Sequence, residues 1–259
     1  MLSLQISDHV RFRSHEHGGV IILDISAGEW VVLNRTAGEL WRSWEAGAEF
    51  DQAISRVAKR YPGVPEAAIR ADAEQLLDEL VERRYVASAG GEAVAGAADL
   101  VCAYAEQADG VDCRSVGAAM AGPETGGSPT RSEWWHGVLA FIFLVVADVL
   151  LRCSFRRSVA LVRLSRKFWC RSAPSPKQAS RTVEAVQLAG RWYPGRAACL
   201  ERSLAAVLMA IAVRRRLDWC LGSVPDPYRF HAWVAADGEP VTASGDDPVL
   251  DQWDPVLNA

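Results

Sequence analysis

A stretch of low-complexity sequence divides the chain and limits how it can fold. Residues 88–131 are rich in glycine and alanine and contain the run Gly122-Pro-Glu-Thr-Gly-Gly-Ser-Pro129. This composition is typical of a flexible connector, because it offers few side chains that could build a core. The 259 residues are therefore predicted to fold as two modules, residues 1–87 and 132–259, joined by a linker over 88–131.

The first module alternates short apolar segments with turn signals. Three strands are predicted over 10–13, 20–24 and 30–33, separated by glycine-containing turns. Three helices are predicted over about 37–44, 50–61 and 66–83, where apolar residues recur at three- and four-residue steps. Three strands followed by three helices predict an α+β, winged-helix-like module.

The charge of this module argues against nucleic acid as its partner. Residues 1–87 contain 10 Lys/Arg and 14 Asp/Glu, so the net charge is 10 − 14 = −4. Phosphate binding needs a basic face, and winged helices that bind DNA have one. The module is therefore expected to bind something other than nucleic acid.

The second module begins with an apolar segment and a basic one. Residues 137–151 are apolar apart from Asp148, but this run is shorter than the roughly 20 residues of a membrane span, so a buried helix is predicted. Basic residues then alternate with apolar ones over 152–171. This basic region is either a solvated helix face, a peripheral contact with an anionic membrane, or a surface for an acidic partner.

A cysteine and a histidine in this module have the order of a thiol catalytic pair. The turn signal Pro194-Gly195 precedes Cys199, and the apolar spacing after it predicts a helix. Unpaired N–H groups in a first helical turn favour a thiolate and can bind an oxyanion. His231 follows 231 − 199 = 32 residues later, on a predicted strand. Cys199 is therefore the candidate nucleophile and His231 the candidate base.

A third group is needed to orient the imidazole. Asp237-Gly238 predicts a two-residue hairpin turn, after which the chain returns antiparallel to the histidine strand. That register puts Ser244 opposite His231 and makes Asp246 a diagonal neighbour on the same face. Asp246 is the first candidate and Asp247 the second.

These residues resemble a known family. Cys199-Leu-Glu-Arg202-Ser203-Leu204, Phe230-His231-Ala232-Trp233-Val234 and the Asp237-Gly238 turn are similar to the transglutaminase-like cysteine peptidases of lasso-peptide biosynthesis. The resemblance covers about 132–241 and implies a papain-like fold in which Cys199 and His231 are catalytic. The family's aspartate falls about a dozen residues after the histidine, where this chain has Ala243.

The first module resembles a second family. Val31-Val-Leu33-Asn34-Arg-Thr36-Ala37 and Leu40-Trp41 are similar to PqqD-like recognition elements, which bind the leader of a ribosomal precursor as an added strand. The resemblance implies a binding surface on the third strand and the last helix. Its residues would be Glu29, Trp30, Val31, Val32, Leu33, Asp72, Gln75, Leu76 and Glu79.

Together the two resemblances predict a leader peptidase of lasso-peptide maturation, the B protein. It would bind the precursor, cut the leader from the core and supply a free core N-terminus to an ATP-dependent, asparagine-synthetase-like cyclase. Two alternatives remain: a non-catalytic scaffold that delivers precursor to the cyclase, and a transglutaminase-like amidase or acyltransferase on another peptide. The sequence has no signal peptide, paired CxxC motif or phosphate-binding glycine loop, so a cytoplasmic protein without metal or cofactor is expected.

Overall fold

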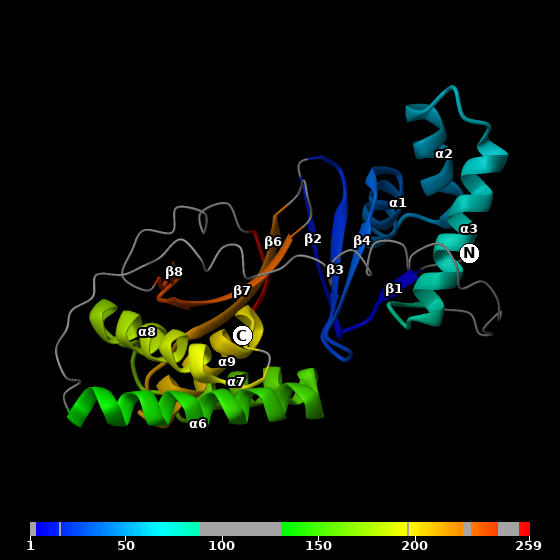
Figure 1. Ribbon diagram of the computed structural model, residues 1–259. Coiled ribbons are helices and arrows are strands. Elements are labelled where there is room, and N and C mark those ends of the chain that lie inside the picture. The colour runs from blue at the N-terminus through cyan, green and yellow to red at the C-terminus, as the bar shows by residue number, and fades with distance from the viewer. Residues whose placement is uncertain (1–3, 16, 89–130, 196, 225–228, 243–253) are drawn as a thin grey trace. The chain divides into compact units, whose positions relative to one another are not determined.

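The chain separates into two compact units, residues 1–110 and 111–259. The computed structural model describes residues 4–15, 17–88, 131–195, 197–224, 229–242 and 254–259 (Figure 1). The predicted linker over 88–131 therefore lies almost entirely outside the described residues.

The first unit is a three-stranded sheet with three helices, as predicted. Its strands β2 (Val10–Ser14), β3 (Val20–Asp24) and β4 (Glu29–Leu33) form an antiparallel sheet in the order β2-β3-β4. The helices are α1 (Arg35–Glu45), α2 (Phe50–Arg60) and α3 (Glu66–Glu82). The sequence analysis did not predict a further pair, β1 (Leu4–Ile6) with β5 (Val86–Ser88), which joins the two ends of the unit.

The sequence explains where these elements begin and which faces they bury. The side chain of Asn34 accepts a hydrogen bond from the N–H of Ala37 at 2.9 Å and so caps α1. Helix α1 then places Leu40, Trp41 and Trp44 in the core at three- and four-residue steps. The central strand β3 is buried along its whole length. The core of the first unit is thus a sheet face covered by amphipathic helices.

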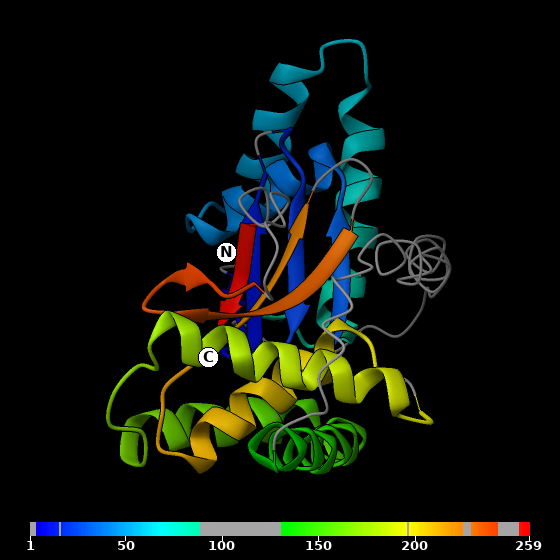
Figure 2. The same ribbon diagram turned by 60° about the vertical axis from the view of Figure 1, so that its left-hand side comes forward.

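In its described residues, the second unit combines four helices with a four-stranded antiparallel sheet. The helices, which lie together next to the sheet (Figures 1 and 2), are α6 (Arg131–Cys153), α7 (Phe155–Phe168), α8 (Pro176–Trp192) and α9 (Cys199–Ala212). The strands are β6 (Asp218–Val224), β7 (Arg229–Ala236), β8 (Glu239–Pro240) and β9 (Asp254–Asn258), in the order β8-β7-β6-β9. Strands β6 and β9 were not predicted.

Helix α9 is the central element of this unit. It packs against α6, α8 and β7, and its residues 203–210 are all buried. Alanines at 205, 206 and 210 allow the neighbouring elements to approach closely, while Leu204 and Val207 are fully buried. The start of α9 is therefore held by packing along the rest of the helix.

Helix α6 differs from the prediction of a buried helix. One face, formed by Ala140, Leu144 and Ala147, is buried, but only 17% of the apolar window within 135–153 is buried inside the unit. Among the described residues this is the one helix long and apolar enough to cross a membrane. The prediction was wrong for the outer face, because apolar composition does not determine whether a second element covers a helix.

Candidate active site

Cys199 is the first residue of α9, as the sequence predicted. Its helix is preceded by Ala198, whose N–H donates to the Glu201 carboxylate at 2.9 Å. The Glu201 side chain thus binds the amide that precedes the thiol residue, and the remaining first-turn N–H groups have no partner further back in the helix. The thiol is half-buried. Here the helix dipole favours a thiolate, and the first-turn amides can bind a developing oxyanion.

The other described cysteines lie in less reactive environments. Burial raises the pKa of the Cys220 thiol to about 12, with a further contribution from Asp218, so Cys220 stays protonated at neutral pH. Burial also raises the pKa of Cys170. Cys153 is the last residue of α6 and is exposed. Cys199 is thus the described thiol whose position suits a nucleophile.

His231 is the third residue of β7. It lies opposite Gly222 of β6, and its ring stacks on that of Trp233 with 6.3 Å between centroids and 10° between planes. Residues two apart in a strand share a face, so stacking on Trp233 limits how the imidazole can turn. The ring is half-buried. The sequence predicted both the strand and the partial burial.

A buried hydrogen bond joins α9 to the sheet. The indole N–H of Trp219 on β6 donates to the hydroxyl of Ser203 at 2.9 Å, and that hydroxyl donates to the Leu200 carbonyl at 3.1 Å. Ser203 lies one turn after Cys199, so this bond fixes the helix start relative to β6. The sequence analysis did not identify this pair, and the only available signal was a serine one turn after the thiol.

The pairing of β7 with β6 shows which face of β7 carries His231 and which face contacts α9, the helix of Cys199. Trp219 pairs with Val234, so α9 contacts the face that carries these two side chains. His231 and Trp233 occupy the alternate face. On its other side, β7 pairs with β8 at Ala235 and Ala236 among the described residues, which leaves the His231 end as the strand's edge. The structure thus brings α9 and β7 together, with His231 on the alternate face of β7, and the meeting of thiol and imidazole stays a prediction.

The hairpin turn after β7 is confirmed. Asp237 and Gly238 both have positive φ, +51° and +88°, the backbone of a two-residue hairpin turn. Ala236 pairs with Glu239 and Ala235 with Pro240, which is the register assumed in the prediction. The candidate orienters Asp246 and Asp247 lie outside the described residues, so their role stays a prediction.

In the first unit, the surface predicted to bind a peptide lies on an edge strand. Strand β4 pairs with β3 on one side only among the described residues. The side chains of Val31 and Leu33 are buried in the core, whereas Glu29 is exposed and Trp30 and Val32 are half-buried. On α3, Asp72 is exposed and Gln75, Leu76 and Glu79 are half-buried. Val31 and Leu33 could therefore contribute to binding through their backbone and not through their side chains.

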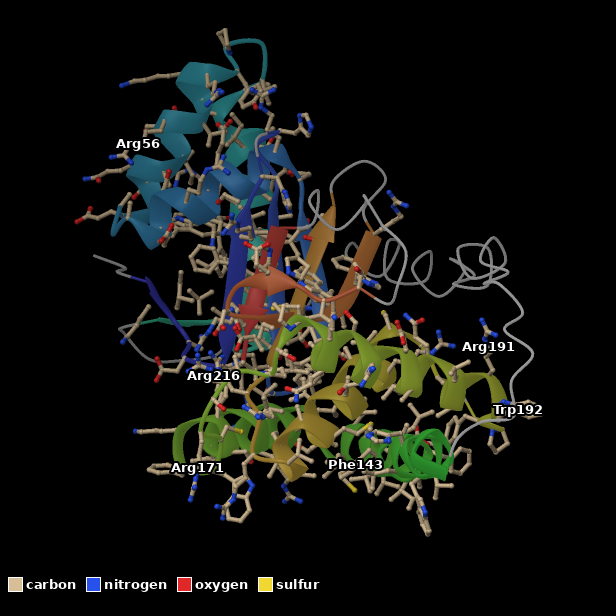
Figure 3. The ribbon with its side chains drawn as sticks, turned by 90° about the vertical axis from the view of Figure 1, so that its left-hand side faces the viewer. Arg56, Phe143, Arg171, Arg191, Trp192 and Arg216 are labelled. Atoms are coloured by element: carbon tan, nitrogen blue, oxygen red, sulfur yellow. The ribbon has the colours of Figure 1, made fainter. Side chains whose placement is uncertain are left out.

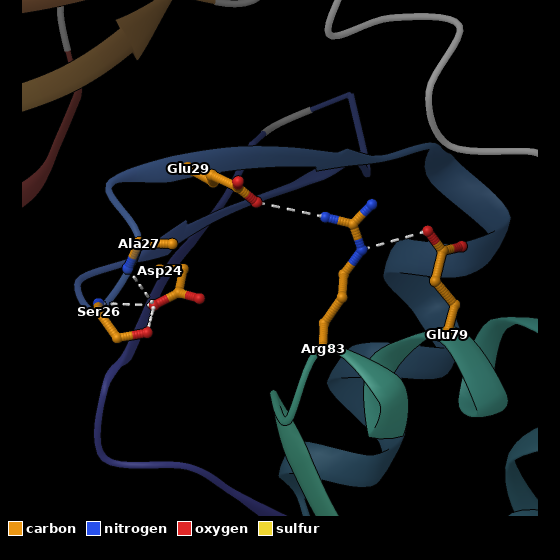
Figure 4. Close-up of polar contacts among 6 residues, drawn as sticks. All are labelled: Asp24, Ser26, Ala27, Glu29, Glu79 and Arg83. Atoms are coloured by element: carbon orange, nitrogen blue, oxygen red, sulfur yellow. Dashed lines mark hydrogen bonds and ion pairs between the residues drawn. The ribbon is translucent and has the colours of Figure 1, made fainter. Parts of the chain in front are cut away.

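An ion-pair bridge connects these two elements (Figure 4). Arg83, directly after α3, contacts Glu79 at 3.3 Å and Glu29 of β4 at 3.6 Å. At the start of the β3–β4 turn, the Asp24 carboxylate accepts from the N–H and hydroxyl of Ser26. Both interactions hold β4 in place. Sequence reasoning did not identify Arg83, although its position four residues after Glu79 is a signal for an ion pair.

Family models match a large part of each unit. Residues 142–257 match the family model of the transglutaminase-like superfamily, and residues 19–86 match that of coenzyme PQQ synthesis protein D (PqqD). The chain thus joins a PqqD-like element to a transglutaminase-like domain, the combination that the sequence resemblances predicted.

Two further comparisons concern individual proteins. A solved structure of TbiB1 in complex with the TbiA(beta) leader peptide aligns with 34% of this chain and 99% of that chain. The sequence identity is 19% and the TM-score is 0.31. A search of curated proteins finds no match to this chain.

Proposed function

We propose that this protein is a leader peptidase of lasso-peptide maturation. The N-terminal unit binds the leader of a ribosomal precursor, and the transglutaminase-like domain cuts the leader from the core. The observation that carries the proposal is Cys199 as the first residue of a buried helix that packs on the strand of His231. The released core would pass to an ATP-dependent, asparagine-synthetase-like cyclase, and the protein would work in the cytoplasm.

The chemistry requires two proton transfers by His231. The imidazole takes the proton from Sγ of Cys199, and the thiolate attacks the carbonyl carbon at the leader–core junction. The first-turn amides of α9 stabilise the oxyanion, the C–N bond breaks, and His231 gives its proton to the leaving amine of the core. Water then hydrolyses the thioester, which releases the leader carboxylate and restores the thiol.

Leader binding would extend the sheet of the first unit. A peptide that adds to the edge of β4 pairs its backbone with that strand and gains specificity from side-chain contacts. Half-buried Leu76 and Gln75 of α3 would supply some of these contacts. The Arg83 bridge from Glu79 to Glu29 supports this role because it ties β4 to the end of α3.

Digestion of a synthetic precursor, followed by mass spectrometry, tests the proposal. The protein should produce one cut at the leader–core junction. Cys199→Ala should abolish the cut and leave leader affinity unchanged, whereas Cys220→Ala serves as the matched control and should still cut. Cleavage by the Cys199→Ala protein would refute the nucleophile assignment.

Disulfide trapping tests whether thiol and imidazole positions meet. Since disulfides need Cα atoms about 4.4–6.8 Å apart, His231→Cys should cross-link to Cys199 under mild oxidation. The comparison variant is Phe230→Cys, whose side chain starts from the same face of β7 as Val234, the face that α9 contacts. Cross-linking of Phe230→Cys alone would show that His231 faces away from the thiol, and the dyad would be excluded.

Leader binding can be tested independently of cleavage. Fluorescence anisotropy with the inactive Cys199→Ala protein would give the affinity of a labelled leader peptide. Asp72→Lys on α3 should weaken binding several-fold, while Asp78→Lys, equally exposed on the same helix but outside the proposed surface, should not. A leader without measurable affinity would remove the recognition role.

One observation supports a second candidate function. Ala243 occupies the position at which the resembled family has its aspartate, which favours a non-catalytic scaffold that delivers the precursor. Tight leader binding without any cleavage by the parent protein would support this alternative. If the protein does cleave, Asp246→Ala should reduce kcat/KM steeply and Asp247→Ala only slightly, because Asp246 is the first candidate orienter.

A further inference from the structure

The outer face of α6 carries a continuous apolar stripe. Large apolar side chains at 135, 139, 142, 146 and 149 follow one another at steps of four and three residues, so they share one face of the helix. Trp135 is 62% exposed, Ile142 50% and Val149 52%. This stripe lies opposite the buried face formed by Ala140, Leu144 and Ala147. At 1.5 Å per residue it is about 21 Å long.

Helix α7 continues this surface with basic and apolar side chains. Arg156, Arg157 and Lys167 are exposed, as are Leu164 and Phe168, the latter at 73%. An open, shallow hollow of about 520 Å³ is lined by Leu164, Phe168, Trp169 and Ile211. The exposed face of α7 thus combines positive charge with large apolar groups.

The charge over this surface is strongly one-sided. Residues 135–171 contain seven Lys/Arg and one acidic residue, Asp148, and one of the seven, Arg166, pairs with Asp218 of β6 at 2.9 Å. The Asp148 carboxylate accepts from Arg152 at 2.9 Å and from the Tyr193 hydroxyl at 2.8 Å, so its charge is already compensated. We therefore expect a partner that covers the apolar stripe to carry negative charge where it meets the neighbouring basic side chains.

Within the second unit, α6 and α7 are neighbours, and α7 also contacts β6 through Phe155 with Trp219 and Arg166 with Asp218. Figure 3 shows the two helices along one edge of the unit, with Phe143 of α6 and Arg171 after α7 labelled there. The two helices also contact each other. The apolar stripe and the basic side chains therefore lie on neighbouring helices, and we call their exposed residues together the α6–α7 face.

We propose that the α6–α7 face binds the surface of an anionic lipid bilayer. A convex helix with apolar, tryptophan-containing and basic side chains suits the boundary between headgroups and acyl chains, where lipid moulds itself to the protein. A protein partner would instead need a groove shaped for the helix. Helix α6 does not span the bilayer, since it packs along α8, whose charged residues include Lys177, Arg181 and Arg191.

Vesicle flotation with the full-length protein tests this proposal. The probes are vesicles of phosphatidylcholine alone and vesicles of phosphatidylcholine mixed with phosphatidylglycerol. We expect binding to the mixed vesicles, weaker binding at high salt because ions screen the headgroup charge, and little binding to phosphatidylcholine. Ile142→Glu should reduce the partition coefficient at least about tenfold, because it places a charge in the apolar stripe.

Matched variants separate lipid binding from other causes. Val64→Glu in the first unit, where the side chain is 45% exposed, should bind like the parent protein. The double reversal Arg156→Glu with Lys167→Glu should remove the preference for anionic vesicles, whereas Lys59→Glu should keep it. Unchanged thermal unfolding of each variant would show that it is folded.

Three outcomes would overturn the proposal. Equal binding of Ile142→Glu and the parent protein to anionic vesicles would show that the stripe is not the contact. No vesicle binding, together with a dimer that Ile142→Glu converts to a monomer in sedimentation velocity, would assign the face to a second copy. No vesicle binding by a monomeric protein would leave an acidic protein or the protein's own first unit as the partner. None of these readouts depends on peptidase activity.

Discussion

Helices α6 and α9 are both apolar and belong to the same unit, yet they have opposite environments. Helix α9 buries residues 203–210 against helices and the sheet, whereas α6 exposes five large apolar side chains along one face. The neighbours of each helix cause this difference, because α9 lies between α6, α8 and β7 and α6 is covered on one side only. Burial therefore follows from position in the unit, and an exposed apolar face marks a surface for another molecule.

The largest expected effect is the difference in unfolding free energy between a side-chain truncation in α9 and one in α6. Leu204→Ala should lower the free energy of unfolding by about 2–5 kcal/mol, because it removes a fully buried side chain and leaves a cavity. Val146→Ala on the outer face of α6 should change it by less than about 0.5 kcal/mol. Chemical denaturation of both variants measures the contrast. A comparable loss in Val146→Ala would mean that the outer face of α6 is covered within the protein.

The sequence predicted the first unit better than the second for identifiable reasons. Asn34 caps α1 with its side chain, and short apolar segments between glycine-containing turns match β2, β3 and β4, so local signals specify these elements. Strands β1 and β5 are three residues each and pair Leu4 with Ser88 across the whole unit. Such short segments carry no pattern of their own, and their pairing depends on the folded chain.

In the second unit, local signals identified the site but not its surroundings. The turn before Cys199 and the apolar spacing after it gave the correct start of α9, and Asp237-Gly238 gave the hairpin. Strand β6 was missed although Pro225 and Pro227 follow it, and it supplies Trp219, the partner of Ser203. The exposure of α6 could not be predicted, since periodicity shows which faces a helix has and not what covers them.

A smaller effect is expected from the hydrogen bond that ties α9 to the sheet. Ser203→Ala should lower the free energy of unfolding by about 1–3 kcal/mol, because the buried Trp219 N–H loses its acceptor. Thr182→Val is the matched control, since that hydroxyl donates to the Gln178 carbonyl of its own helix and its loss should change stability by less than about 0.5 kcal/mol. Equal stability of the Ser203→Ala and parent proteins would mean that packing alone fixes the start of α9.

The smallest expected effect concerns the polar anchor of α6. The hydrogen bond from Tyr193 lowers the pKa of Asp148, and Arg152 acts in the same direction, while burial opposes both. Because the folded state favours the ionised carboxylate, its contribution to stability is complete above the ordinary aspartate pKa of about 3.9 and is lost as the pH falls through the lowered value. Asp148→Asn should therefore be less stable than the parent protein at neutral pH, and the difference should shrink below about pH 4. Denaturation curves of both proteins across this range provide the measurement, and a difference independent of pH would show that the anchor acts through hydrogen bonding alone. Since α6 is covered on one side only, this anchor would then hold the helix by geometry and not by charge.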